Sequence, residues 1–159
     1  MSSSASGMMI SIFFLAIMLP GFFITQILDR LGRNSVFISF GMITAGLALI
    51  LLLHREPVIA LGSFLVGAGY GILQPIAYDK TVIIARPDKA IFALSLTMAA
   101  SYLAIVVYPF IMAFFQGIFD DTSASFPFLV NGILTLLVAV AGYRYRHTFT
   151  FGVDPSKLK

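Results

Sequence analysis

Five long stretches of the chain contain no Asp, Glu, Lys or Arg. They comprise residues 7–28, 35–53, 58–78, 90–115 and 126–143 and are 18 to 26 residues long. About 20 apolar residues in helical form cross the ~30 Å hydrocarbon core of a bilayer. Only 11% of the 159 residues are charged, whereas a soluble domain is about 25% charged. These features exclude an ordinary soluble globule, a nucleic-acid-binding module and a disordered tail.

The pattern within the stretches predicts helices rather than barrel strands. They lack the alternation of apolar and polar residues that marks a transmembrane strand. We therefore expect an all-α polytopic membrane protein with five transmembrane helices. These helices would form a single transmembrane domain over residues 1–159, which includes a tail over residues 144–159.

Basic residues concentrate in alternate loops. The loops after the first and third spans, together with the tail, hold nine of them: Arg30, Arg33, Lys80, Arg86, Lys89, Arg144, Arg146, Lys157 and Lys159. The segments on the opposite side hold Arg55 alone. Because cytoplasmic loops of membrane proteins carry an excess of Lys and Arg, we predict an outer N-terminus and a cytoplasmic C-terminus in the cell (inner) membrane.

The chain offers few groups for catalysis or metal binding. It has no cysteine, which excludes disulfides, Cys-ligated zinc and thiolate chemistry. Its two histidines, His54 and His147, fall on opposite sides of the predicted membrane. No span contains an ionisable Asp, Glu, His, Lys or Arg, so proton or sodium coupling cannot be assigned to these residues. We therefore expect no metal, no cofactor and no catalytic residue, and an intramembrane enzyme is the least favoured hypothesis.

Small and polar residues form a stripe along the third span. Spacings of three or four residues place five of them on one helix face: Ser63, Gly67, Gly71, Gln74 and Tyr78. Gly67 and Gly71 would let another helix approach closely. Gln74 and Tyr78, beside Pro75, suit either helix packing or the wall of a solute cavity, and both interpretations stay open.

The fourth span carries a similar stripe. Thr97, Ser101 and Tyr108 share a helix face, and Pro109 predicts a kink. In the fifth span, Asn131 and Thr135 are interpreted as contacts between helices.

A charged loop joins the first two spans. Residues 28–34 read Leu-Asp-Arg-Leu-Gly-Arg-Asn, so that an acid closes one helix, a glycine permits a tight reversal and two arginines lie at the predicted cytoplasmic face. This Asp-Arg-x-Gly-Arg spacing between apolar helices resembles the signature loop of the major facilitator superfamily (MFS). The residues that carry the resemblance are Asp29, Arg30, Gly32 and Arg33.

The rest of the chain is similar to helices eight to twelve of that family, in which a weaker copy of the loop lies between the eighth and ninth helices. After a short outer loop, a glycine-rich helix ends in Gly-Ile-Leu-Gln-Pro over residues 71–75, like the family's tenth helix. A basic loop, a long eleventh-like helix and a twelfth-like helix follow. The resemblance implies an incomplete C-terminal half of the MFS fold, in the orientation that the basic residues predict.

The resemblance implies a secondary transporter that moves a small solute by alternating access between two six-helix halves. Asp29, Arg30 and Arg33 would hold the cytoplasmic ends of the halves together in one state. The residues expected to line or gate the solute path are Gln74, Tyr78, Ser101, Tyr102 and Tyr108, and those expected to shape the helix packing are Gly67, Gly71, Pro75 and Pro109.

Because the family has twelve helices, the resemblance also implies that the N-terminal half and the seventh helix are supplied elsewhere. We expect the chain not to transport without them. The expected partners are the lipid bilayer, a small solute, and a complementary half or a second copy of the chain.

The alternative hypothesis is a truncated or partner-binding helical membrane protein without transport activity. The tail residues 143–147 mix aromatic and basic side chains, a pattern also found in nucleic-acid-binding patches. Such patches need a larger basic surface, so we interpret the segment as a headgroup anchor and expect no nucleic-acid partner.

Overall fold

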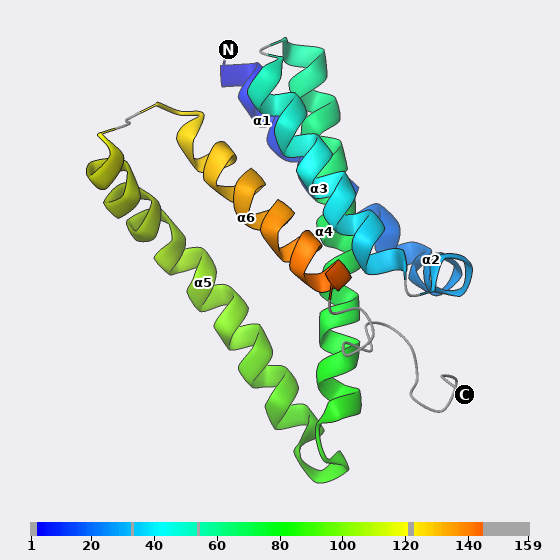
Figure 1. The fold of residues 1–159 in the computed structure, drawn as a ribbon. Helices are drawn as coiled ribbons and strands as arrows, with labels where there is room; N and C mark the ends of the chain where they lie inside the picture. The colour runs from blue at the N-terminus through cyan, green and yellow to red at the C-terminus, as the bar shows by residue number, and fades with distance from the viewer. Residues whose placement is uncertain (1–2, 33, 54, 121–122, 145–159) are drawn as a thin grey trace. The chain divides into compact units, whose positions relative to one another are not determined.

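The computed structural model describes residues 3–32, 34–53, 55–120 and 123–144, and over these residues the chain forms helices and no strand. The elements along the chain (Figure 1) are α1 (Ser3–Phe22), α2 (Ile24–Leu31), α3 (Asn34–Leu52), α4 (Glu56–Ile84), the 3-10 helix η1 (Pro87–Lys89), α5 (Ala90–Phe119) and α6 (Phe126–Arg144). The predicted all-α fold class is confirmed.

Several of these helices are long and apolar enough to cross a membrane. In the described part of the chain α3, α4, α5 and α6 each meet this condition. The segments Ser6–Phe22 of α1 and Ile24–Leu31 of α2 meet it together as a pair, and they are bent by 71° relative to each other. The described residues thus include four helices able to span a membrane, or five if the bent pair forms one span, as in a multi-pass membrane protein.

The helices belong to two compact units, which we describe separately. Unit 1 comprises Met1–Ile76 and Phe128–Lys159, and unit 2 comprises Ala77–Pro127. The helix α4 continues from unit 1 into unit 2 after Ile76.

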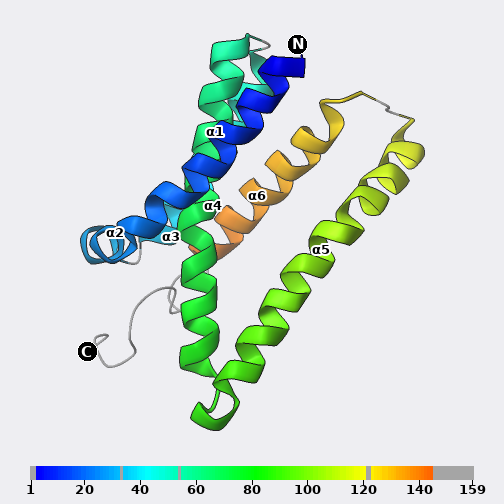
Figure 2. The same ribbon diagram turned by 180° about the vertical axis from the view of Figure 1, so that it is seen from behind.

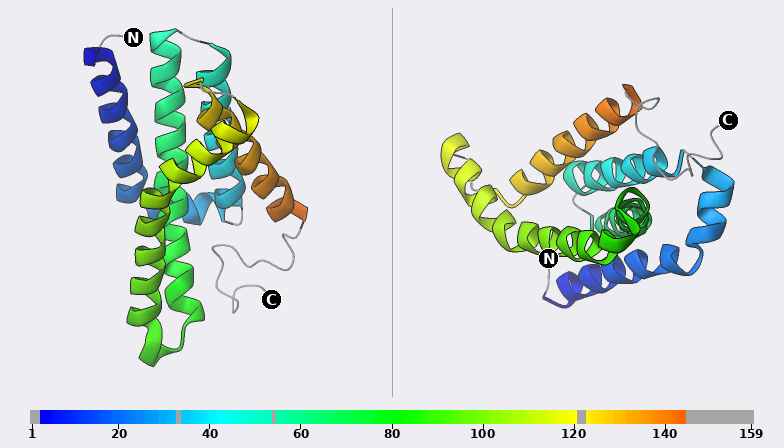
Figure 3. Two further views of the ribbon diagram at one scale, coloured as in Figure 1. Left: turned by 90° about the vertical axis from the view of Figure 1, so that its left-hand side faces the viewer. Right: turned by 90° about the horizontal axis from the view of Figure 1, so that it is seen from below.

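In unit 1, the first part of α4 runs between α1 and α3 (Figure 3). A buried cluster of Val36, Ile72 and Ile76 joins α3 to α4. Residues of α2 pack against the same cluster, and Figure 2 shows α2 at the end of α1. The core of unit 1 therefore lies where the end of the bent pair meets α3 and α4.

The first predicted span differs from a single straight helix. Phe23 separates α1 from α2 with φ −120° and ψ 15°, and its N–H donates to the Pro20 carbonyl at 3.0 Å. Proline lacks the N–H that would bond to the preceding turn, and Gly21 is a poor helix former. The bend lies just after this Pro-Gly pair, where the helix is weakened.

In unit 2, the helices extend beyond the predicted spans. α4 continues six residues past Tyr78, to Ile84, and α5 ends at Phe119 rather than at residue 115. Residues 79–84 contain neither glycine nor proline, so nothing in them stops the helix. Arg86 takes an extended conformation, φ −62° and ψ 144°, because the residue before a proline avoids the α region. α5 continues through Pro109 without a break.

Candidate functional site

The connection between α2 and α3 is a tight reversal at Gly32. This residue has φ 51° and ψ −126°, a conformation that side chains disfavour. Its N–H donates to the Leu28 carbonyl at 2.8 Å and closes the last turn of α2. A Cβ atom at Gly32 would meet nothing within 4 Å, so the backbone conformation alone selects glycine. Arg33, also predicted as a loop residue, lies outside the described residues.

Two buried serines lie in the first turns of α3, and the first of them bonds to the reversal. The Ser35 hydroxyl donates to the Gly32 carbonyl at 2.7 Å, and the Ser39 hydroxyl donates to the Ser35 carbonyl at 2.8 Å. The two side chains are 1% and 0% exposed. Neither serine was predicted from the sequence to have a role, although two serines four residues apart at the start of a span are a usable signal.

The helix α2 is amphipathic and combines residues that pack on the core with exposed charges. Ile24, Ile27 and Leu28 pack against the buried cluster of α3 and α4. Asp29 and Arg30 are exposed. The apolar residues anchor α2 in the core, while the side chains of the predicted charged pair stay exposed.

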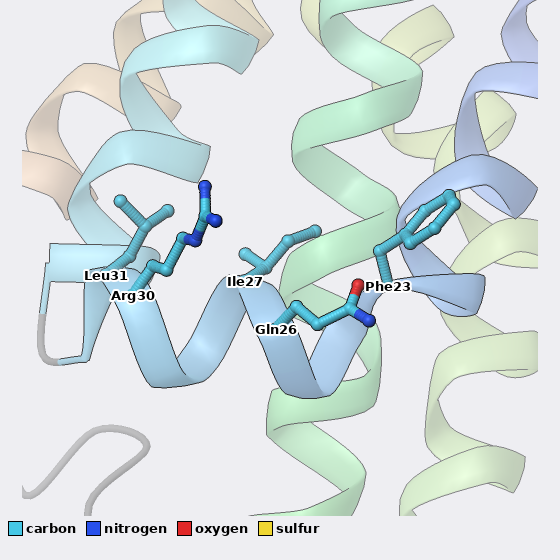
Figure 4. A pocket seen from close by; sticks show the side chains of 5 residues that line it. All are labelled: Phe23, Gln26, Ile27, Arg30 and Leu31. Carbon is cyan, nitrogen blue, oxygen red and sulfur yellow. The ribbon is translucent and has the colours of Figure 1, made fainter.

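A shallow hollow of about 570 Å³ runs along α2, lined by Phe23, Gln26, Ile27, Arg30 and Leu31. Figure 4 shows Ile27, Arg30 and Leu31 on the same side of the helix and the Gln26 amide directed toward Phe23. An apolar floor bordered by a guanidinium and an amide can receive an apolar side chain together with a carboxylate.

Glycines of α4 bring α1 into backbone contact. A Cβ atom built at Gly67 would lie 2.5 Å from the Phe13 carbonyl oxygen, and one at Gly71 would meet the Ile17 carbonyl oxygen. Side chains at these positions would therefore push α1 away. The two glycines predicted to permit close helix approach lie at this crossing.

Other glycines of α4 face α3. A Cβ atom at Gly69 would lie 2.7 Å from the Ser39 carbonyl oxygen, and one at Gly62 would lie 2.7 Å from the Gly46 carbonyl oxygen. This second glycine face of α4 was not predicted from the sequence. The spacing of seven residues between Gly62 and Gly69 was the available signal, since positions seven apart share one side of a helix.

The predicted solute-path residues are divided between the two units. Gln74 belongs to unit 1 and is half-buried, whereas Tyr78, Ser101, Tyr102 and Tyr108 belong to unit 2. The Ser101 hydroxyl donates to the Thr97 carbonyl at 2.9 Å. The Tyr102 side chain is 70% exposed and that of Tyr108 is 38% exposed.

A polar contact joins α4 to α5 within unit 2. The hydroxyl oxygens of Thr81 and Thr97 lie 3.5 Å apart, and each hydroxyl donates to a carbonyl of its own helix. Ser101 lies one turn beyond Thr97. The role of these side chains in a solute path stays a prediction.

The family model described as Major Facilitator Superfamily matches residues 1–157 of the chain. The chain belongs to the Major Facilitator Superfamily. Members of this superfamily are transporters rather than enzymes, so the chain is a membrane chain of transporter type, as the loop resemblance implied. Neither the comparison with curated proteins nor the comparison with solved structures found a match.

The matched residues include the whole α2–α3 reversal. The match includes the exposed Asp29–Arg30 pair, Gly32 and the bent helix that precedes them. The correspondence of these helices to the eighth and ninth of the family stays a prediction. Among the described residues, no group of three or more His, Asp or Glu side chains could hold a metal ion.

Proposed function

We propose that this chain supplies the equivalents of helices eight to twelve of an MFS secondary transporter, which moves a small solute by alternating access. The supporting observation is the Gly32 reversal, which follows the exposed side chains of Asp29 and Arg30 in a chain matched over residues 1–157. Asp29, Arg30 and Arg33 would hold this half to the complementary half in one state and release it in the other.

The packing of unit 1 suits such a movement. Backbone contacts at Gly67 and Gly69 fix α4 against α1 and α3, and closely packed helices move as a body rather than deforming continuously. A rocking movement of this body would carry α2 and its charges with it. The hollow along α2 would receive a side chain of the complementary half in the associated state.

The solute path in this proposal uses the polar residues of α4 and α5, namely Gln74, Tyr78, Ser101, Tyr102 and Tyr108. The predicted spans contain no ionisable acid or base. If transport is coupled to protons or sodium ions, the coupling residue belongs to the complementary helices.

Vesicles containing the chain alone, or the chain with a candidate complementary half, test the proposal by uptake of radiolabelled sugars, amino acids and organic anions. We expect uptake only from the pair. Arg30→Gln should lower the initial rate about tenfold, the effect of losing one charged hydrogen bond of about 1.4 kcal/mol. Arg55→Gln, at an exposed arginine in the α3–α4 connection, is the matched control.

Uptake by the chain alone would refute the need for a complementary half. Equal losses in the Arg30 and Arg55 variants would refute a specific role for the α2–α3 loop. Immunoblots of the vesicles would show whether each variant is present in the same amount.

The second candidate function is a membrane protein that binds a partner without transport. The most apolar 18-residue segments of α5 and α6 favour this alternative, because only 0% and 6% of their residues are buried. These faces would contact a second copy of the chain or another membrane protein. Crosslinked oligomers in vesicles, with no uptake from any combination of halves, would support this alternative.

A further inference from the structure

A groove separates α3 from α6 within unit 1 and has a volume of about 510 Å³. Its lining residues are Phe37, Gly41, Thr44, Ala45 and Ala48 of α3 and Leu136, Ala139, Val140 and Tyr143 of α6. Seven of these nine side chains are wholly apolar. The volume falls within the ~300–1,000 Å³ of ligand pockets, and the groove lies between two helices that are apolar enough to span the membrane.

An aromatic pair marks one end of the groove. The rings of Phe37 and Tyr143 meet edge to face with centroids 5.7 Å apart. The start of α3 and the end of α6 are therefore neighbours, as Figure 3 also shows. Tyrosine is frequent at the boundary between hydrocarbon and headgroups, so this end of the groove suits the interface.

One positive charge lies at the same end of the groove, because the exposed Arg144 follows Tyr143. The exposed Arg30 lies on α2, four residues before α3 begins. Asp29 is the neighbouring acidic residue on α2. Arg33, outside the described residues, adds a further positive charge to the same stretch of sequence.

We propose that the α3–α6 groove binds an acyl chain of an anionic phospholipid whose phosphate lies beside Arg144. A single phospholipid supplies both the hydrocarbon that the lining requires and the negative charge that Arg144 requires. Guanidinium groups bind phosphate oxygens through two parallel hydrogen bonds. This inference concerns unit 1 alone and does not depend on the transport proposal.

A tryptophan placed in the groove can report a bound lipid, because the chain has no tryptophan of its own. Val140→Trp places the reporter in the groove. Val138→Trp is the matched control, because Val138 does not line the groove, has a similar exposure (51% against 59%) and lies only about 3 Å along the helix axis from Val140. Vesicles would contain brominated phosphatidylglycerol in phosphatidylcholine, or brominated phosphatidylcholine in phosphatidylglycerol.

Quenching of each tryptophan gives the association constant of phosphatidylglycerol relative to phosphatidylcholine. At Val140→Trp we expect a ratio of about five, the effect of one basic residue near an anionic headgroup. At Val138→Trp we expect a ratio near one. Equal ratios at the two positions would overturn the proposal.

Two variants separate the contributions of charge and shape. Arg144→Gln should return the ratio at Val140→Trp toward one. Gly41→Leu should do the same by filling the groove, since a Cβ atom at Gly41 meets nothing within 4 Å. Circular dichroism and the Val138→Trp reporter would check that each variant is folded. A ratio that survives Gly41→Leu would reflect surface attraction without a groove site and would overturn the proposal.

Discussion

At the scale of single residues, glycine serves two separate physical purposes in this protein. Gly32 has open space around it but a positive φ, so its lack of a side chain is needed for the backbone conformation. Gly67 lies in a regular helix but faces the Phe13 carbonyl, so its lack of a side chain is needed for space. Alanine should therefore destabilise the protein at either position, through an unfavourable backbone conformation at Gly32 and through steric overlap at Gly67.

Gly32→Ala is expected to lower the free energy of unfolding by about 1–3 kcal/mol, because alanine would be held in a sparsely populated backbone region. Gly117→Ala is the control, since Gly117 lies inside α5 with no atom near its Cβ position. That change should leave stability equal or raise it by about 0.5–1 kcal/mol. Denaturant titration in detergent micelles, followed by circular dichroism, measures both. Equal stabilities of the Gly32 and Gly117 variants would contradict the argument.

At the scale of the elements, the contacts of α4 with α1 and α3 depend on glycines, because only a residue without a side chain lets the backbones approach this closely. Gly67→Ala is expected to lower the free energy of unfolding by about 1–3 kcal/mol, the usual effect of overpacking a close contact. Gly41→Ala, at a helical position with open space, should have no such effect. The same titration compares the variants, and a Gly67 variant as stable as the Gly41 variant would show that α1 moves aside freely.

The helices were predictable from sequence, but the bend between α1 and α2 was not. Uncharged apolar stretches of sufficient length can hardly be anything but spanning helices, and α3 and α6 begin and end within a few residues of the predictions. Pro20 alone does not determine the bend, because proline and Gly21 are also tolerated in straight spans. The sharp turn at Phe23 coincides with the packing of Ile24, Ile27 and Leu28 against α3 and α4, which a single stretch of sequence does not specify.

The candidate site was predictable only where its structure depends on residues adjacent in sequence. The Asp29–Gly32 reversal depends on local chemistry, and the sequence identified it. Burial of Ser39 and contact of Gly69 with α3 depend on a helix crossing that brings distant residues together. Spacing identified one glycine face of α4, but it could not show that a second face is in use.

At the scale of the whole molecule, the membrane orientation predicted from the distribution of basic residues is open to direct test. The chain lacks cysteine, so single cysteines at Asn34 and Ser123, both exposed, can be labelled with an impermeant maleimide. We expect Asn34→Cys to react only from the cytoplasmic side and Ser123→Cys only from the outside. Labelling of both positions from the same side would contradict the five-span topology.

The length of α4 has a consequence for the bilayer itself. Its 29 residues correspond to about 44 Å of helix, against a hydrocarbon core of about 30 Å. Even a tilt of about 40°, the upper end of the usual range, leaves the helix longer than this core. The helical turns that carry Asp79 and Lys80 would thus extend beyond the hydrocarbon core and lie among the headgroups, a segment we call the stalk. A thicker bilayer would draw more of this stalk into hydrocarbon, and the energy of burying its charges would then oppose residence in such membranes.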